Sequence, residues 1–353
     1  MNKKVIAVVF GGVSSEYEVS LKSAYSVIKA INHKKYNVIM LGITRDGLWL
    51  RYSGDIEDIP TDKWHLDKSN LIKSTISPAR CGGLVEFVDG AEIIIPIDIV
   101  FPVLHGKNGE DGTIQGLCEL AGIPVVGSGS AASALCMDKY RAQKLVEFEG
   151  ISVTKSICYE RIPSDDKLIA DAKTLRLPIF VKPVKAGSSI GVTMVEDYAK
   201  IPEAVKLAYQ HDDVVILEQG IIGKEVGCAV IGNFELSTGR VNEIEVSHGF
   251  FDYKEKYTLE TSEIIVPARI DPETEKRIQE VGKTVFRILG CKGYARMDLF
   301  LTDDGEIIFN EANTIPGFTS LSQFPAMMRA AGMEYEEVVE KLIELGLLAL
   351  ENK

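Results

Sequence analysis

Apolar and polar positions alternate in blocks along the first third of the chain. Strand-like apolar runs cover residues 5–10 and 38–44, and residues 21–31 between them have the apolar spacing of an amphipathic helix. Residues 93–101 form a longer apolar run, which predicts a buried strand, and a helix is expected to end near residue 121. Strands that alternate with helices are typical of a parallel α/β domain. The polar segment 46–90 has no clear periodicity.

The pattern changes after the glycine- and serine-rich segment 127–130, which we take as the first domain boundary. An α+β order of elements follows, with a helix at 139–149 and strands at 153–160, 179–183, 192–195 and 214–219. The last part has strands at 225–231 and 240–246, a long charged loop, a helix at 272–289, strands at 294–301 and 306–310, and a helix from residue 335. We therefore predict three domains, at residues 1–128, 129–222 and 223–353.

Composition agrees with several domains, because a chain of 353 residues that is 46% hydrophobic is larger than one ordinary core. The net charge is −12 and the basic residues are spread along the sequence, so neither nucleic acid nor an anionic membrane is an expected partner. The N-terminal apolar segment has about seven residues, whereas a membrane-spanning helix needs about 20. Six cysteines without a Cys-x-x-Cys pair are typical of buried thiols in a reducing cytoplasm. These features predict a cytoplasmic protein that acts on small molecules.

Charged and amide side chains recur at alternate positions in the last two predicted strands. Alternate residues of a strand share one face, so Arg296 projects with Asp298, and Glu311 projects with Asn313. A short turn at 303–305 joins the strands and brings these faces side by side. Oxygen ligands from Asp298, Glu311 and Asn313 on one face suit Mg²⁺. The alternative is a solvated face with Arg296 in a salt bridge, but the apolar residues before Glu311 indicate an interior strand, where unpaired carboxylates are costly.

A turn rich in glycine and serine, residues 185–191, follows the strand that contains Lys182. Its small residues let a phosphate approach the backbone, and Lys182 and Lys185 would neutralise the phosphate charge. Alone, such a turn is only a flexible segment. Its position after a strand with an interior lysine, which needs an anionic partner, favours phosphate binding.

His105 follows the predicted buried strand at the point where an α/β sheet normally presents ligands. A single histidine is more often structural than catalytic. Here Gly106, Gly109 and Gly112 flank an acidic pair, which indicates a tightly shaped loop that lines a cleft.

Two motifs together resemble those of the D-alanyl-D-alanine ligases of the ATP-grasp superfamily, which include the vancomycin-resistance ligases. They are His105-Gly106-x-x-Gly109-Glu110-Asp111-Gly112, and Arg296-x-Asp298 followed by Asn310-Glu311-Ala312-Asn313-Thr314-Ile315-Pro316-Gly317. The resemblance extends through essentially the whole chain and is greatest to the G-type resistance ligases, which make D-alanyl-D-serine. It implies an α/β and α+β ATP-grasp fold with an N-terminal Rossmann-like parallel-sheet domain, and a homodimer formed through that domain.

The resemblance also implies a role for each site residue. ATP, a substrate, would lie between the second and third domains, and two Mg²⁺ ions, with Mn²⁺ as an alternative, would bridge its phosphates. The ATP-binding residues would be Lys139, Lys182, Ser188, Ser189, Glu218, Gln219, Ile221 and Glu225, and the metal ligands would be Asp298, Glu311 and Asn313. The first D-alanine would bind Glu16 near Val19 and His105, under a triad of Glu16, Ser188 and Tyr257. Lys256 and Ser322, beside Gln323, would hold the acceptor carboxylate.

The implied reaction converts the D-alanine carboxylate to an acyl phosphate, which the amine of a second D-amino acid attacks to give a dipeptide for cell-wall synthesis. Arg296 and the Gly317 backbone N–H would stabilise the oxyanion formed in that attack. Water destroys an acyl phosphate, so a lid is required, and the aromatic and charged loop 249–261 is the candidate. Family members that make D-alanyl-D-lactate have a histidine-containing loop in place of the Lys256-Tyr257 pair, so this pair indicates an amine acceptor.

Two amides bear on the choice of acceptor, which the resemblance gives as D-serine. Gln323 stands where D-alanyl-D-alanine ligases commonly have leucine, and its amide can hydrogen-bond a serine hydroxyl. The D-serine enzymes usually have an arginine there and an acidic residue at the position of Asn242, and this chain has neither charge. The two amides either form a matched pair around the hydroxyl or mark a pocket that prefers D-alanine. The alternatives are a D-alanine-D-alanine ligase, another ATP-grasp carboxylate-amine ligase, and a non-catalytic ATP-binding regulator.

Overall fold

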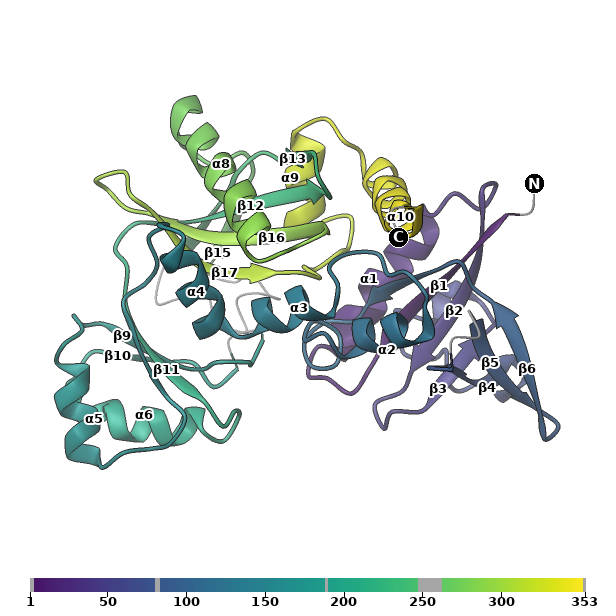
Figure 1. Ribbon diagram of the computed structural model, residues 1–353, viewed down its shortest axis with the longest axis horizontal. Helices are drawn as coiled ribbons and strands as arrows, with labels where there is room; N and C mark the ends of the chain where they lie inside the picture. Colours follow the sequence, from purple (N-terminus) through teal and green to yellow (C-terminus); the bar gives the residue numbers. More distant parts are fainter. Residues whose placement is uncertain (1–2, 80–82, 188–189, 247–261, 352–353) are drawn as a thin grey trace.

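The computed structural model describes residues 3–79, 83–187, 190–246 and 262–351. These residues form three sheets, which lie at the right, the lower left and the top of Figure 1, each with helices packed against it. The sheets contain residues 4–103, 156–219 and 224–313 respectively, within the three domains predicted from the sequence. The predicted α/β and α+β organisation is therefore confirmed, while the domain boundaries themselves stay a prediction.

The first sheet has seven strands in the order β6-β5-β4-β3-β2-β1-β7. Its strands are β1 (Lys4–Gly11), β2 (Tyr36–Ile43), β3 (Trp49–Tyr52), β4 (Leu71–Ile76), β5 (Gly83–Val88), β6 (Ala91–Pro96) and β7 (Ile99–Val103). Only β2, β1 and β7 are parallel, as the sequence predicted, and α1 (Tyr17–Ala30) and α2 (Thr113–Ala121) accompany them. The segment without clear periodicity supplies the antiparallel strands β3, β4 and β5.

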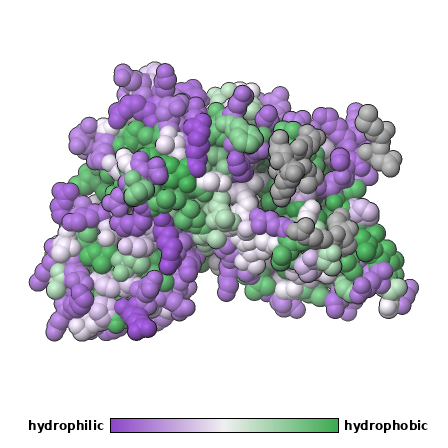
Figure 2. All heavy atoms as spheres, viewed as in Figure 1, coloured by the Kyte–Doolittle hydropathy of each residue, from purple (hydrophilic) through white to green (hydrophobic). Residues whose placement is uncertain are grey.

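The prediction of one buried strand over residues 93–101 is wrong. The run divides into β6, which ends at Pro96 and pairs only with β5, and β7, which is buried beside β1. Asp98 turns the chain between them, because its carboxylate accepts a hydrogen bond of 2.8 Å from the Val5 N–H. Apolar character alone did not separate the two, since β6 leaves Ile93 and Ile94 about half exposed at the sheet edge. Figure 2 shows apolar surface at this end of the molecule.

The second sheet is antiparallel, in the order β10-β9-β11-β8. Its strands are β8 (Ser156–Tyr159), β9 (Ile179–Pro183), β10 (Thr193–Val195) and β11 (Val215–Gln219), and it packs with α5 (Asp165–Ala172) and α6 (Ile201–Ala208) around an apolar core. Two helices precede it, α3 (Ser130–Met137) and α4 (Lys139–Phe148). Cys136, Ala142 and Val146 of these helices belong to the core of the third sheet, so the two units share α3 and α4.

The third sheet follows the order β15-β14-β12-β16-β17, with β13 paired to β12. Its elements are β12 (Lys224–Gly232), β13 (Leu236–Thr238), β14 (Asn242–Val246), β15 (Ser262–Ile265), β16 (Gly293–Leu301) and β17 (Ile307–Asn313), with the helices α8 (Pro272–Ile288), α9 (Gln323–Ala330) and α10 (Tyr335–Glu351). The structure corrects the prediction that residues 307–309 form an interior strand, because β17 is the last strand of the sheet. Its residues are nevertheless buried, since the chain at Ser152 and Val153 covers the edge and accepts the Phe309 N–H at 2.8 Å. Short 3₁₀ helices occur at Ile56–Asp58, Lys68–Asn70 and Tyr198–Lys200.

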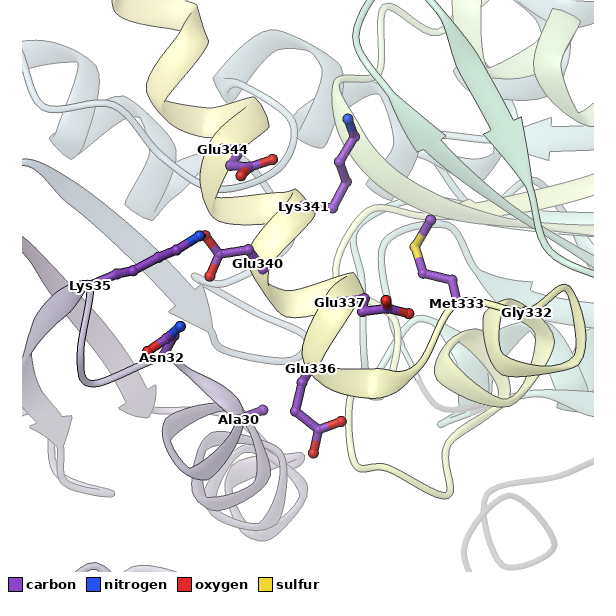
Figure 3. Close-up of a pocket in the computed structure, with 10 residues that line it drawn as sticks. All are labelled: Ala30, Asn32, Lys35, Gly332, Met333, Glu336, Glu337, Glu340, Lys341 and Glu344. Carbon is purple, nitrogen blue, oxygen red and sulfur yellow. The ribbon is translucent and has the colours of Figure 1, made fainter.

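One apolar core joins the first unit to the third. It extends from Phe10 and Phe101 of the first sheet to Phe318, Phe324 and the inner face of α10. A shallow groove of about 550 Å³ lies on the solvent side of this junction, where Lys35 after α1 reaches Glu340 of α10 at 2.9 Å (Figure 3). No helix in the described ranges is long and apolar enough to cross a membrane.

Candidate active site

The pairing of β16 with β17 assembles the predicted metal ligands. Asp298 is opposite Glu311, and Arg296 is opposite Asn313, as the alternation of side chains in the two strands predicted. Arg296 donates two parallel hydrogen bonds to Asp298, of 2.6 and 2.7 Å, and Asn313 donates a third, of 2.8 Å. Burial lowers the pKa of Arg296, but the Asp298 charge outweighs it and holds that pKa above its ordinary value. The guanidinium therefore stays charged, and its remaining N–H groups are available to a ligand.

This donor set fits a divalent cation that is shared with a nucleotide. Two carboxylates and an amide supply oxygen ligands, and Mg²⁺ usually takes only one or two carboxylates from a protein and the rest from phosphate and water. Accordingly, in the part of the chain that the structure describes, no three His, Cys, Asp or Glu side chains gather closely enough to hold a metal by themselves. The assignment of Asp298, Glu311 and Asn313 as ligands stays a prediction.

Lys182 and Glu218 form an ion pair that faces these strands from the second sheet. The lysine ammonium contacts one carboxylate oxygen, and both side chains are largely buried. Burial lowers the pKa of Lys182, but the Glu218 charge raises it further, so the pKa lies above its ordinary value. The sequence required an anionic partner for this lysine, and the structure supplies Glu218 in that role.

Gln143 of α4 secures the other side of Glu218. Its amide donates to Glu218 at 2.8 Å and to the backbone oxygen of Asn310 at 3.1 Å. It therefore ties the second sheet to β17, one residue before Glu311. Nothing in the sequence marked Gln143, because a single amide on a mostly apolar helix face has no distinctive pattern.

Lys139, at the start of α4, bridges the same two units. Its ammonium donates to the Ala186 backbone oxygen at 3.0 Å and lies 3.4 Å from a carboxylate oxygen of Glu311. The predicted phosphate-binding turn thus begins beside the predicted metal strand. Ser188 and Ser189, the hydroxyls of that turn, lie outside the described residues.

The Glu16 carboxylate lies where the first unit meets this turn. Glu16 precedes α1 and is 8% exposed. One of its oxygens is so close to Gly106 and Gly187 that a β-carbon on Gly106 would lie 2.4 Å from it, and one on Gly187 3.0 Å. Gly106 also has a φ of +71°, which favours glycine, whereas a β-carbon on Gly187 would need the Glu16 carboxylate to move slightly. Val19 is half-buried on α1, one turn further along.

His105 is engaged within the protein through both ring nitrogens. Nδ1 donates to the Ile315 backbone oxygen at 3.0 Å, so Nε2 accepts from the Ser23 hydroxyl, also at 3.0 Å. Burial lowers the pKa of His105, which keeps this tautomer neutral. The location of His105 in the D-alanine subsite stays a prediction. The sequence did not indicate Ser23 as its hydrogen-bond partner.

Glu110 of the same loop is held as a neutral acid. Burial first, and then the Glu16 charge, raise its pKa to about 8. Its carboxyl oxygen accepts the Gly106 N–H at 2.7 Å. The Glu110 carboxyl is therefore mostly protonated at neutral pH.

The predicted acceptor end lies at the start of α9. Ser322 caps the turn before the helix by accepting the Thr319 N–H at 3.0 Å, and its hydroxyl is close to Gly317. Asn242, fully buried on β14, donates to the Gln323 side-chain oxygen at 3.1 Å. These residues therefore come together as predicted, although no helix was expected at 323–330.

The remaining predicted residues differ in what the structure says of them. Glu225 on β12 is close enough to raise the pKa of Lys182. The Gln219 side chain turns to the surface and accepts the Arg176 N–H at 2.9 Å, and Ile221 is half-buried in the following loop. Lys256, Tyr257 and the predicted lid lie outside the described residues.

Comparison with known proteins shows similarity along nearly the whole chain. The family model described as D-ala D-ala ligase N-terminus matches residues 5–128, and the model described as D-ala D-ala ligase C-terminus matches residues 146–344. The solved structure of VanG D-Ala:D-Ser ligase from Enterococcus faecalis is similar with a TM-score of 0.91 and 52% identity, over 98% of this chain and 99% of that one.

Two curated proteins illustrate the range of similar enzymes. The vancomycin B-type resistance protein VanB of Enterococcus faecalis is 43% identical, over 98% of this chain and 99% of its own. The D-alanine-D-alanine ligase of Caldicellulosiruptor bescii is 41% identical, over 98% of this chain and 96% of its own.

The state of Glu110 predicts a pH dependence of stability. The unfolded chain ionises this carboxyl near its ordinary pKa of 4.5, and the folded protein only near 8. The stability that the protonated Glu110 carboxyl contributes is fully present below pH 4.5 and is lost as the pH rises to 8, by about 4 kcal/mol. Glu110→Gln should remove this slope, so that between pH 5 and 8 the variant loses less free energy of unfolding than the wild type.

Urea unfolding at several pH values measures this difference. Glu119→Gln, which changes an exposed carboxylate of the same unit, serves as the control and should keep the wild-type slope. Equal slopes for Glu110→Gln and the wild type would show that Glu110 is ionised in the folded protein.

Proposed function

The chain belongs to the D-alanine-D-alanine ligase family, and from that premise we propose that it joins D-alanine to D-serine through a D-alanyl phosphate intermediate. Membership makes the protein an ATP-dependent, ADP-forming ligase with the ATP-grasp fold, and implies that it uses a divalent metal. The finer points, which are the acceptor, the intermediate and the residue roles, are the proposal.

The first chemical step needs charge neutralisation above all. A D-alanine carboxylate oxygen attacks the γ-phosphorus of ATP, the bond to the β-phosphate oxygen breaks, and ADP leaves with that bonding pair. Lys139 and Lys182 lie at the junction of the two ATP-grasp sheets, where they would hold the phosphates. The buried carboxylate side chain of Glu16 would hold the D-alanine ammonium. Divalent cations bound by Asp298, Glu311 and Asn313 would supply further neutralisation of the transferring group.

The second step forms the peptide bond. The acceptor amine attacks the acyl carbon, and the tetrahedral intermediate collapses with loss of inorganic phosphate and one proton. The N–H groups of Arg296 that do not face Asp298, together with the Gly317 N–H, would donate to the oxyanion. The intermediate would be shielded from water by the loop 249–261.

The orientation of Gln323 is the observation that carries the D-serine assignment. The Asn242 amide nitrogen donates to the Gln323 oxygen at 3.1 Å, while the Asn242 oxygen is buried near Gly227 without a hydrogen-bond partner in the described part of the chain. The Gln323 nitrogen is left as a donor, and among the described residues it has no acceptor. A D-serine hydroxyl can accept that hydrogen bond, whereas a D-alanine methyl group cannot.

The similarity to a ligase titled D-Ala:D-Ser supports the same acceptor. A D-alanine-D-alanine ligase is the second candidate, because a relative at 41% identity has that name. We further propose that the dipeptide is a cell-wall precursor linked to vancomycin resistance, in keeping with the name of VanB. The two Mg²⁺ ions and the homodimer through the first unit are part of the proposal.

The metal assignment predicts the effect of Glu311→Ala. Loss of the carboxylate between the two ATP-grasp sheets should lower turnover by at least about a hundredfold, because phosphate charge is left unneutralised. The fold should persist, since Lys139 keeps its hydrogen bond to Ala186. Initial rates of ADP release, with circular dichroism as the check on folding, measure both effects.

Glu306→Ala is the matched control, because this exposed glutamate directly precedes the same strand and, among the described residues, its carboxylate hydrogen-bonds to the Ser152 hydroxyl. It should turn over at the wild-type rate. Near-normal activity of Glu311→Ala would remove Glu311 from the site.

The acceptor proposal predicts the outcome of a competition. With D-alanine and D-serine at equal concentration, D-alanyl-D-serine should be the major dipeptide. An acceptor methyl group leaves the Gln323 amide partly unpaired, at a cost of about 1–3 kcal/mol, or about 5- to 150-fold in product ratio. Separation of the two dipeptides by chromatography and mass spectrometry gives the ratio.

Gln323→Leu should shift the product ratio toward D-alanyl-D-alanine with little change in the total rate. A wild-type mixture dominated by D-alanyl-D-alanine would overturn the D-serine assignment. If the ratio of the two dipeptides is unchanged in Gln323→Leu, the Gln323 side chain does not determine the choice of acceptor.

A further inference from the structure

The loop that joins β17 to α9 presents one free backbone donor at Gly317. Its neighbours Ile315, Pro316 and Phe318 are buried, while Gly317 is partly exposed. Within the described ranges the Gly317 N–H donates to no acceptor, whereas the Phe318 N–H is hydrogen-bonded. A backbone N–H that has no acceptor, between residues whose backbone groups are hydrogen-bonded, is suited to bind an anionic ligand.

Residues of the first unit hold the loop on the N-terminal side of Gly317. His105 donates to the Ile315 backbone oxygen at 3.0 Å, and Glu110 accepts the Ile315 N–H. The peptide planes on both sides of Ile315 are therefore fixed by side chains that are about 205 positions earlier in the sequence. Pro316 then restricts the next backbone torsion angle.

Ser23 of α1 holds the loop on the C-terminal side of Gly317. Its hydroxyl oxygen accepts the Phe318 N–H at 3.3 Å, and its proton is donated to His105 Nε2 at 3.0 Å. Ser23 is fully buried. A carbonyl oxygen can only accept, so the His105–Ile315 bond places the ring proton on Nδ1, and the hydroxyl must act in this direction.

Phe318 itself is fixed by packing as well as by this bond. Its carbonyl oxygen accepts the Tyr335 hydroxyl at 2.6 Å. Its ring is 5.3 Å from that of Tyr294 and 6.4 Å from that of Phe101 in the first sheet. The peptide plane that carries the Gly317 N–H thus lies between two fixed segments and has little freedom to turn.

We propose that Ser23 is a positioning residue for peptide-bond formation, which aims the Gly317 N–H by holding both His105 and the Phe318 N–H. This rests on the proposed role of the Gly317 N–H as an oxyanion donor. Ser23 touches no reacting atom, and it acts through the backbone of the loop. The geometry makes the first unit part of the acyl-transfer site, beyond any part in binding D-alanine.

The same helix offers a matched control one turn earlier. The Ser20 hydroxyl is also fully buried, accepts the Gly11 N–H at 2.8 Å and donates to the Val103 backbone oxygen. Ser20→Ala and Ser23→Ala therefore each remove a buried hydroxyl with two hydrogen bonds from α1. Only Ser23 contacts the loop at Gly317.

The test measures both ADP and total dipeptide at saturating substrates. An oxyanion donor that is poorly aimed slows capture of the acyl phosphate by the amine, so water takes a larger share. Ser23→Ala should lower the rate of dipeptide formation about tenfold and release clearly more than one ADP per dipeptide, with KM for ATP changed less than about twofold. Ser20→Ala should lose comparable stability and keep the wild-type rate and the ratio of one.

Ser23→Cys keeps a weak donor and acceptor of similar size, so its dipeptide rate and its ratio of ADP to dipeptide should lie between those of the wild type and Ser23→Ala. If Ser23→Ala does not fold, Ser23→Cys takes its place in the test. The proposal would be overturned if the ratio of ADP to dipeptide stays at one in both Ser23 variants, or if it rises equally in Ser20→Ala. Both dipeptides are counted, so the result is independent of the acceptor. A wild-type protein that forms no dipeptide at all would instead contradict the proposed function.

Discussion

Buried charges need partners of opposite sign, and this requirement determines how the side chains are paired where the second and third sheets meet. Arg296 is paired with Asp298, Lys182 with Glu218, and Lys139 with Glu311. The Lys182–Glu218 pair lies within the second sheet, whereas the Lys139–Glu311 pair joins α4 to β17 of the third sheet, so one of the charges that would receive ATP also connects the two halves of the ATP-grasp fold.

The first unit contributes more than a neighbouring surface. Its core continues into the third unit through Phe101 and Phe318, and Ser23, His105 and Glu110 bind the backbone of the loop before α9. Glu16 extends from the same unit to the turn that follows Lys182. Side chains of the first unit thus reach both the second and the third unit, as expected if the proposed acyl phosphate is to be kept from water.

Local periodicity was sufficient to predict that Asp298 and Glu311 lie on paired strands, and that Lys182 needs an anionic partner. Alternation in a strand places Asp298 and Glu311 on one face whatever the rest of the fold does. Periodicity gave a wrong prediction over residues 93–101, because the half-exposed edge strand β6 and the buried strand β7 follow each other in one continuous apolar run. It also failed to indicate Ser23 and Gln143, because their contacts join residues 75 or more positions apart and are set by how the units pack. The family resemblance supplied roles for single residues that no local pattern contains.

The central claim is that a D-alanyl phosphate is formed and then captured by D-serine. Reaction with ATP, D-serine and D-alanine labelled with oxygen-18 in both carboxylate oxygens tests it directly, with mass spectrometry of the dipeptide and of inorganic phosphate. One label should remain in the peptide carbonyl of D-alanyl-D-serine, and the other should appear in phosphate, because the attacking carboxylate oxygen leaves with the phosphoryl group. Phosphate without label, or D-alanyl-D-alanine as the main labelled product, would contradict the account.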